Sequence, residues 1–387
     1  MPSLRRATHI GLLTASLVFI ASGTALAAEE VLQTNIGESG SWESNPLMLL
    51  HGARDLYGST TSPELIFSDN TPTIKFSADT LVNENLFNLS NFDSTDIHEN
   101  INFNDQPTPR WAYGAQAKVD YDTSRTSEIT NFNAVNGPVR HLGIYGAPQI
   151  SFNPTPVDKF ALTGSAQSSQ YDNSVFQDYD LYTVDPTFTR AVDPLDSAIV
   201  GVEVQRYLTT SGVALRTDAV SPSIGWQKSF TPRLSATASA GPQFTRQSGG
   251  GISTDWQLSY NFSADVTYKG IQDTTDFIAS RNQYPFANGS DALSTILSVT
   301  EKHAINELLT ANIGGGYQTA DYPTTPGPLS FNSQITGNAG LTYHVTEHID
   351  VNGSYQYRYE TFTGTSLNAQ DNLVMLGVTW HPQSWGL

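Results

Sequence analysis

The chain contains no cysteine among its 387 residues. Disulfide bonds, thiolate metal sites and a cysteine nucleophile are therefore excluded. Basic residues are also scarce, since 19 Lys and Arg stand against 37 Asp and Glu and give a formal net charge of −18. Nucleic acid is not expected as a partner, because its recognition depends on a basic surface.

Long apolar runs are missing after the N-terminal segment. The first 27 residues hold Arg5 and Arg6, an apolar stretch over 10–20 and the small-residue motif Ala25-Leu26-Ala27. This order is typical of a cleaved secretory signal peptide, with Ala25 and Ala27 at the cleavage site. No later stretch reaches the roughly 20 apolar residues that a transmembrane helix needs. We therefore expect a signal peptide over 1–27 and no transmembrane helix after it.

The sequence instead has long, strict alternation of apolar and polar residues. Between 256 and 269 every even position is apolar, from Trp256 to Tyr268, and every odd position is polar. Side chains alternate between the two faces of a strand, so this range predicts a strand with one apolar and one polar face. The same period recurs over 111–122, 309–318, 333–345 and 349–360.

Strand length distinguishes a membrane protein from a soluble one. Soluble strands typically run about 5–6 residues, whereas a tilted membrane strand needs about 9–11. The predicted strands reach that length, and their polar face carries charged residues, as a water-lined face does. We predict an all-β fold, a transmembrane antiparallel up-and-down β-barrel; an exported β-sandwich or β-helix is the alternative. Aromatic girdles are expected at Trp111, Phe160, Trp256, Tyr268, Tyr343, Tyr359 and Trp380.

Short turns and longer polar loops alternate along the chain. Such a rhythm is typical of outer-membrane barrels, whose turns are periplasmic and whose loops are external. It predicts about 18 strands (16 is the alternative), periplasmic termini and location in the bacterial outer membrane. The expected turns are 69–73, 106–110, 154–158, 192–196, 231–233, 269–273, 301–303 and 346–348. The expected loops are 51–59, 87–96, 124–139, 171–177, 208–217, 246–254, 283–291, 320–329 and 362–371.

After the signal peptide, we expect the chain to form a single barrel domain. We expect residues 28–58 to form an N-terminal segment with the first strand, at about 33–49, and residues 59–387 to form the remainder of one barrel. No separate plug domain is expected. No loop is clearly long enough to fold deep into the lumen, although 124–139 could narrow it. An 18-strand barrel is wide enough to leave an aqueous channel.

Several short motifs resemble those of one barrel family. They are Glu43-Ser44-Asn45-Pro46-Leu47, Ser62-Pro63-Glu64-Leu65, Thr231-Pro232-Arg233 and the closing segment 376–382. Together they resemble the β-barrel porin type 2 group, which includes the exosortase-associated outer-membrane proteins. The resemblance implies a barrel with a link to surface polysaccharide export, and it implies no catalytic residues.

The C-terminal strand predicts a further partner. Residues 373–380 alternate, and Trp380 and Trp385 follow the pattern of a terminal strand read by the barrel-assembly machinery. The remaining expected partners are outer-membrane lipid, lipopolysaccharide and small polar solutes. No cofactor is expected.

The polar face is the place where a function is expected. Acids outnumber bases among the candidate lumen-facing residues, so we expect a water-filled channel for small polar solutes that leans toward cations. The alternatives are a polysaccharide export conduit and a non-conducting structural or adhesive barrel. These candidates can equally be ordinary solvated residues of a lumen wall. The candidates are Lys75, Asp79, Lys118, Asp120, Asp122, Glu203, Asp265, Lys269, Asp350, Arg358 and Glu360.

One motif suggests an enzyme at first sight. His344, Glu347 and His348 match H-x-x-E-H, the inverted zinc-protease signature. That chemistry requires a helix, on which the two histidines share a face. The segment instead ends a predicted strand and enters a turn, so we do not expect an enzyme.

Overall fold

The computed structural model describes residues 29–127, 138–172, 176–212, 214–285, 291–322, 331–363 and 366–386. The expected signal peptide, with Ala25 and Ala27, lies outside the described residues.

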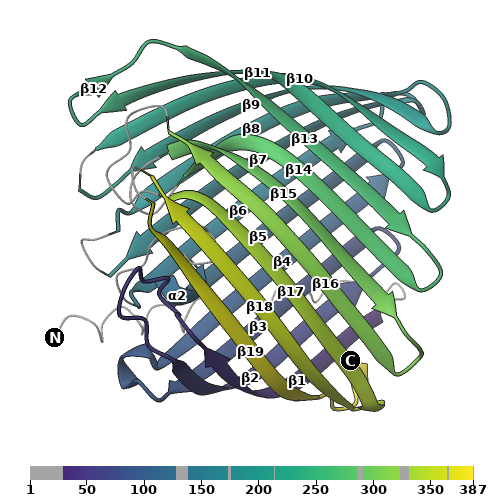
Figure 1. Ribbon diagram of the computed structural model, residues 1–387. Coiled ribbons are helices and arrows are strands. Elements are labelled where there is room, and N and C mark those ends of the chain that lie inside the picture. The colour runs from purple at the N-terminus through teal and green to yellow at the C-terminus, as the bar shows by residue number, and fades with distance from the viewer. Residues whose placement is uncertain are drawn as a thin grey trace, which may run out of the picture.

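The described residues form a closed β-barrel of 18 long strands (Figure 1). Each long strand pairs antiparallel with the next one in the chain, and β19 pairs back to β1 from Ile36 opposite Trp380 to Glu43 opposite Leu373. Because β1 and β19 pair, the barrel wall has no unpaired first or last strand, whose backbone groups a bilayer could not satisfy. The predicted all-β barrel and its strand number are confirmed.

The first nine strands are β1 (Glu29–Glu43), β2 (Leu56–Asn70), β3 (Ile74–Phe87), β4 (Ser94–Thr108), β5 (Trp111–Thr123), β6 (Arg140–Phe152), β7 (Asp158–Tyr171), β8 (Tyr179–Ala191) and β9 (Asp196–Thr209). The other long strands are β10 (Leu215–Thr231), β11 (Leu234–Gly249), β13 (Gln257–Lys269), β14 (Asp273–Pro285), β15 (Asp291–Ala304), β16 (Leu309–Asp321), β17 (Phe331–Thr346), β18 (Ile349–Phe362) and β19 (Asn368–Trp380).

Four short elements complete the description. They are β12 (Ile252–Ser253), β20 (Trp385–Gly386), the 3₁₀ helix η1 (Ser90–Phe92) and the helix α2 (Ser124–Ser127). No helix in the described part of the chain is long and apolar enough to cross a membrane.

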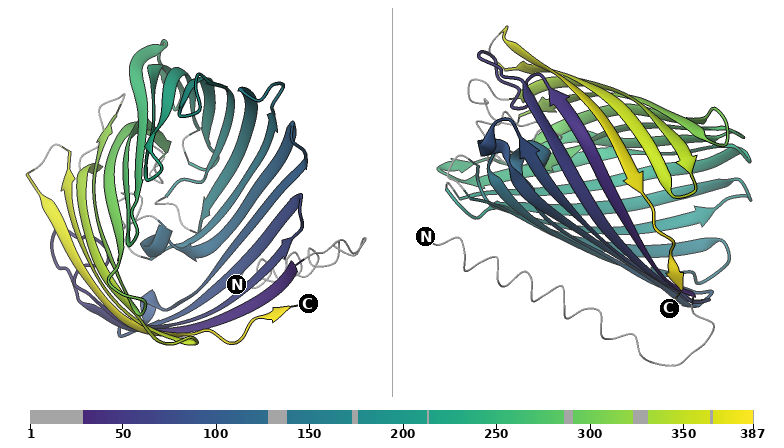
Figure 2. Two further views of the ribbon diagram at one scale, coloured as in Figure 1. Left: turned by 90° about the vertical axis from the view of Figure 1, so that its right-hand side faces the viewer. Right: turned by 90° about the horizontal axis from the view of Figure 1, so that it is seen from below.

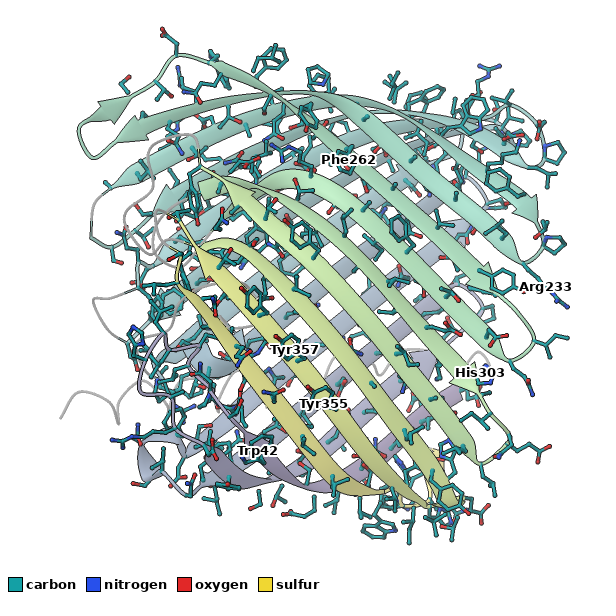
Figure 3. The ribbon with its side chains drawn as sticks, viewed as in Figure 1. Trp42, Arg233, Phe262, His303, Tyr355 and Tyr357 are labelled. Carbon is teal, nitrogen blue, oxygen red and sulfur yellow. The ribbon has the colours of Figure 1, made fainter. Side chains whose placement is uncertain are left out.

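The connections give the barrel two different ends. Eight connections of two to five residues, beginning with 71–73 and ending with 347–348, lie at one end, which we call the turn end. The strand ends that the other nine connections join lie at the opposite end, which we call the loop end. In Figure 3, Arg233 in the connection 232–233 marks the turn end, and the left view of Figure 2 looks into the barrel from that end.

The outer face is the apolar one. Directly opposed residues of neighbouring strands share a face, so the register extends each predicted face around the barrel. Leu258, Ile224 and Leu376 point outward with 68–73 % of their surface exposed. Exposed apolar side chains on every side are typical of a surface that contacts lipid, and Figure 3 shows Tyr355 and Tyr357 on the outside of β18.

Strands β1–β4 depart from this pattern. Their outer face carries several acids, and three of these, Glu38, Glu84 and Glu99, each accept a hydrogen bond from a threonine on a neighbouring strand. The bonds are Thr61 to Glu38 (2.5 Å), Thr95 to Glu84 (2.6 Å) and Thr80 to Glu99 (2.7 Å). Sequence alternation is weak here, and only the register places these acids outside.

Two sequence expectations about boundaries are wrong. The first strand runs from Glu29 to Glu43 rather than over 33–49, because Pro46 cannot donate a ladder hydrogen bond and the chain turns away before it. The turn expected at 301–303 lies at 305–308, since Glu301 and His303 pair with Ile313 and Ala311 inside β15 and β16. Asn306 caps that turn by accepting bonds from the backbone of Leu308 and Leu309.

Candidate functional site

The inner wall is polar along its length. The register places all eleven candidate lumen residues on the inner face, opposite to the face of the exposed apolar side chains. Lys269 lies at the turn-end rim, and Arg358 and Glu360 lie near the loop end. The wall also carries acids that alternation alone did not single out: Glu43, Glu64, Asp96, Asp185, Asp276 and Asp371. A role of these residues in conduction stays a prediction.

Histidine–aspartate pairs line part of this wall. Nδ1 of His98 lies 2.7 Å from Asp120, and Nδ1 of His141 lies 2.9 Å from Asp122. At the turn end, Asp350 lies 2.6 Å from His344 and 3.2 Å from His381. The lumen acids Asp120, Asp122 and Asp350 are thus hydrogen-bonded rather than free.

The loop end is narrowed from inside by residues 44–55, which connect β1 to β2. Met48 of this segment is 97 % buried in an apolar cluster with Tyr171, Tyr179 and Tyr207. Those tyrosines come from β7–β9, on the opposite side of the barrel from β18 and β19, which contribute Phe362 and Ala369 to the same cluster. Residues 44–55 therefore reach into the lumen and pack against its far wall.

A turn shapes this segment. The Met48 amide donates to the Asn45 carbonyl (3.0 Å), with Pro46 favouring the tight turn between them. The Asn45 side chain accepts from the Leu49 amide (2.9 Å) and donates to the Leu49 carbonyl (3.0 Å). Met48 has a φ of +50°, a conformation that a non-glycine residue adopts rarely and at a cost.

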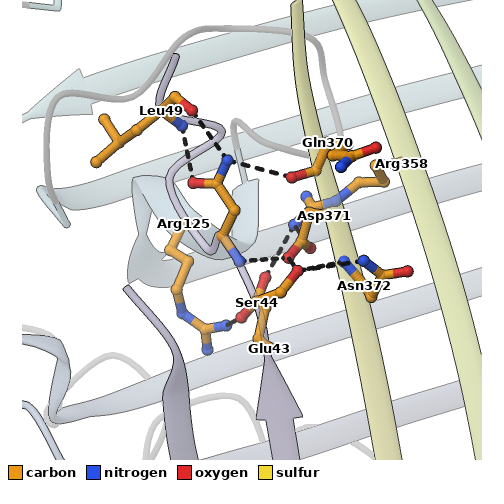
Figure 4. A network of polar contacts seen from close by, with 9 residues as sticks. Glu43, Ser44, Leu49, Arg125, Arg358, Gln370, Asp371 and Asn372 are labelled. Atoms are coloured by element: carbon orange, nitrogen blue, oxygen red, sulfur yellow. Dashed lines mark hydrogen bonds and ion pairs between the residues drawn. The ribbon is translucent and has the colours of Figure 1, made fainter. Parts of the chain in front are cut away.

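Asp371 of β19 holds the base of this segment (Figure 4). One of its oxygens accepts from the Asn45 amide (2.7 Å) and from the Ser44 hydroxyl (3.2 Å). Its other oxygen accepts from Arg358 (2.7 Å), which also donates to Glu43 (2.9 Å). The Asp371 carboxylate thus links the segment to Arg358 of the wall, and the Ser44 hydroxyl and the Asn45 side chain add bonds to Asn372 and Gln370.

This network is buried and extends to α2. Arg125 donates to the second oxygen of Glu43 (3.2 Å), so two arginines face Glu43 and Asp371. The side chains of Glu43, Arg358 and Asp371 are 5 %, 7 % and 1 % exposed. Buried charges persist only when paired and hydrogen-bonded, and these side chains meet both conditions.

The sequence expectation that no loop is clearly long enough to fold deep into the lumen is therefore wrong, because residues 44–55 reach its far wall. Narrowing of the lumen by 124–139 stays a prediction. From 124–139 the described residues contribute Arg125 to the network and Val139 to the apolar cluster. Residues 128–137 lie outside the described part of the chain.

The loop-end parts of β14 and β15 form a hairpin that leaves the barrel wall. Pairing between β13 and β14 stops at Phe262 opposite Arg281, yet β14 continues to pair with β15 as far as Pro285 opposite Asp291. Gln283 accepts a hydrogen bond from Gln243 of β11 (3.1 Å), so this hairpin lies under β11. Ala292 of the hairpin packs with Ala320 and Phe331. The inward residues Thr217 of β10 and Gln243 of β11 are each 1 % exposed at this end of the barrel.

Tyr322, close to the mouth, keeps its phenol protonated. Burial, together with the nearby Glu360 carboxylate, raises the pKa of Tyr322 to about 12. Tyr322 packs against the apolar cluster of Ala292 and Phe331. The hydroxyl is buried, and it is neutral at physiological pH, as a tyrosine also is at its ordinary pKa.

The zinc-protease motif lies on a strand and a turn, whereas its chemistry requires a helix. His344 lies in β17 and pairs with Asp350, while His348 lies in the following turn, 3.6 Å from Glu347. The described residues contain one group with ligand atoms close enough for a metal ion, formed by Asp273, Glu301 and His303 on the outer face at the turn end. Sequence spacing gave no signal for it, because the ligands come from two strands.

Solved barrels resemble the fold at low sequence identity. The outer membrane channel DcaP of Acinetobacter baumannii is 12 % identical with a TM-score of 0.44, and the alignment covers 94 % of this chain and 100 % of that one. OccK2 (OpdF) of Pseudomonas aeruginosa in complex with glucuronate is 10 % identical, with a TM-score of 0.47 and coverages of 92 % and 99 %. OpdK of Pseudomonas aeruginosa with vanillate is 11 % identical, with a TM-score of 0.46 and the same coverages.

No curated protein matches the sequence. At the level of protein families, residues 251–381 match the model described as "Putative beta-barrel porin 2", which is the family that the sequence motifs resemble.

Proposed function

We propose that the protein is a water-filled channel of the bacterial outer membrane for small polar solutes, that it prefers cations, and that residues 44–55 constrict its loop-side mouth. The observation that carries the proposal is the acidic inner face of the closed barrel. Carboxylates occur on this face in β2, β3, β5, β8, β9, β13 and β18, so negative charge is distributed around much of the wall.

Electrostatics supports the cation preference. A channel lined by carboxylates lowers the energy of a cation inside it and raises that of an anion. Arg125, Arg140 and Arg358 at the loop end are each paired with an acid, so they add little field of their own. Asp79 and Glu203 face the lumen without an ion-pair partner among the described residues.

The reversal potential in a planar lipid bilayer under a salt gradient tests the proposal. We expect cation selectivity in the wild type and reduced selectivity in the double variant D79N/E203Q. The matched control is E38Q/E84Q, which removes the same charge from the outer face and should leave the reversal potential unchanged. Anion selectivity of the wild type, or equal effects of the two variants, would contradict the proposal.

A non-conducting barrel is the second candidate, and the packing at the loop end favours it. Met48 and its aromatic partners cross the mouth, so single-channel steps absent from the wild type but present after removal of this segment would indicate a closed barrel. The polysaccharide conduit rests on the family resemblance alone. It predicts loss of surface polysaccharide when the gene is deleted.

A further inference from the structure

The outer surface of β9–β11 carries three arginines at the loop end. Arg206, Arg216 and Arg246 surround Asp218, at 2.8, 2.6 and 3.6 Å. We call these four residues the arginine cluster. The register explains the arrangement, because Asp218 lies directly opposite both Arg206 and Arg246, and Arg216 is two positions away on the same face of β10.

The cluster lies at the edge of the apolar surface. The preceding outward row consists of Val204, Val220 and Phe244, which are mutually opposed on the same three strands. Two residues along a strand advance by about 6.8 Å. The guanidinium groups therefore lie one step beyond this apolar row, where we expect lipid acyl chains to give way to headgroups.

The arginine cluster carries a net positive charge. Asp218 has a side-chain exposure of 13 %, whereas the three arginine side chains are 39–50 % exposed. One carboxylate cannot neutralise three guanidinium groups. The other outward acid of β8–β11 at this end is Asp180, opposite Leu208, and the sum over these five groups is still positive.

Two bases near the turn-end rim of β7–β10 are placed differently. Arg190 pairs with Asp158 (3.5 Å), and Lys228 pairs with Asp196 (3.0 Å). Each of these two bases has one acid, whereas three arginines share Asp218. This local excess of positive charge occurs in a chain whose overall charge is strongly negative.

The chemistry that fits this surface is a lipid phosphate. Guanidinium groups bind phosphate through paired, charge-assisted hydrogen bonds, and the adjacent apolar row can contact acyl chains. Trp256, whose ring lies 5.3 Å from the Arg246 guanidinium, adds an aromatic side chain at the same level. A soluble anion has no acyl chain that could contact the apolar row.

We propose that Arg206, Arg216 and Arg246 bind the phosphates of a phosphorylated glycolipid of the outer leaflet, with its acyl chains along Val204, Val220 and Phe244. The loop end faces the outer leaflet in the orientation expected from the turns and loops. The proposal does not depend on conduction, so it stands or falls separately from the proposed channel.

Native mass spectrometry of the purified barrel in neutral detergent, with diphosphorylated lipid A as the probe, tests the site. We expect R206Q/R216Q/R246Q to bind the lipid at least about tenfold more weakly, since several charge-assisted hydrogen bonds are lost. The control R190Q/K228Q removes bases from the turn-end rim and should bind like the wild type. Equal binding by the triple variant, or an equal loss in the control, would overturn the proposal.

Two further arms separate the sources of phosphate and guard against misfolding. Inorganic phosphate at the concentration of the lipid should not displace it; full displacement would overturn the assignment to a lipid. D218N keeps all three arginines and removes the central acid, so it should bind lipid A more tightly than the wild type. Unchanged or weaker binding by folded D218N would count against the site even if the triple variant failed to fold.

Discussion

At the scale of single residues, the mouth depends on a few buried charges. Asp371 joins the backbone of Asn45 to the guanidinium of Arg358, and Arg358 in turn neutralises Glu43. Removing the arginine leaves two carboxylates buried side by side, with Arg125 as the remaining base that contacts Glu43. Such an uncompensated charge is among the most destabilising changes that a single substitution makes.

We therefore expect Arg358→Met to lower the free energy of unfolding in lipid vesicles by about 3–5 kcal/mol. Arg190→Met is the matched control, because it also removes an arginine–aspartate pair, but one whose arginine is 62 % exposed. Exposed pairs contribute about 1 kcal/mol or less. Urea titrations of the two variants measure the difference, and equal losses would argue against a buried network at the mouth.

At the scale of the strand, the two faces meet different media. Ile224 in β10 points outward and is 73 % exposed, whereas its neighbour Ser223 points into the lumen. The residues opposite Ile224 in β9 and β11, Val200 and Ala240, are apolar as well. A charge on the outer face would enter hydrocarbon, but a charge on the inner face would meet water and the lumen acids.

Ile224→Arg should lower the free energy of unfolding in vesicles by about 2–4 kcal/mol, the cost of a basic residue on the lipid face. Ser223→Arg, one position away, should change it little. The same unfolding titration measures both variants. A larger loss for the inner substitution would mean that the faces are assigned the wrong way round.

At the scale of the whole molecule, a wide barrel is combined with a narrowed end. Eighteen strands enclose a lumen wide enough for water, while residues 44–55 and the β14–β15 hairpin enter it from the loop end. Conductance should then be controlled at the mouth, and selectivity by the acidic wall below it.

Replacing residues 46–51 with a short Gly-Ser linker should raise single-channel conductance, because the linker cannot form the Met48 cluster. The control replaces the connection 153–157, at the turn end, with Gly and Ser residues and should leave conductance as in the wild type. Planar-bilayer recordings give both values. Unchanged conductance in the first variant would show that the segment does not limit flow.

Cation selectivity should also weaken as salt concentration rises. The Debye length falls from about 10 Å at 0.1 M to about 3 Å at 1 M ionic strength, so carboxylates on the wall lose their influence over the middle of the lumen. Reversal potentials measured at a fixed gradient ratio but at increasing total salt check this. Selectivity that is independent of salt would point to a narrow contact site instead of a charged wall.

The sequence by itself determined the architecture. Alternation over 111–122, 256–269 and 349–360 predicted strands β5, β13 and β18 to within a few residues, and the rhythm of turns and loops predicted their number. Both signals are local, since side-chain period and turn chemistry depend on neighbours in the chain. The family match over 251–381 agrees with the resemblance read from the motifs.

Only the tertiary structure decided what lies at the mouth and on the rims. Met48 meets Tyr179 and Tyr207, and Glu43 meets Arg358 and Asp371, across separations that no local pattern encodes. Likewise, Arg206, Arg216 and Arg246 converge on Asp218 because three strands share one register. Closure of the barrel creates these contacts, so they follow from how the strands pair and not from the period of any one of them.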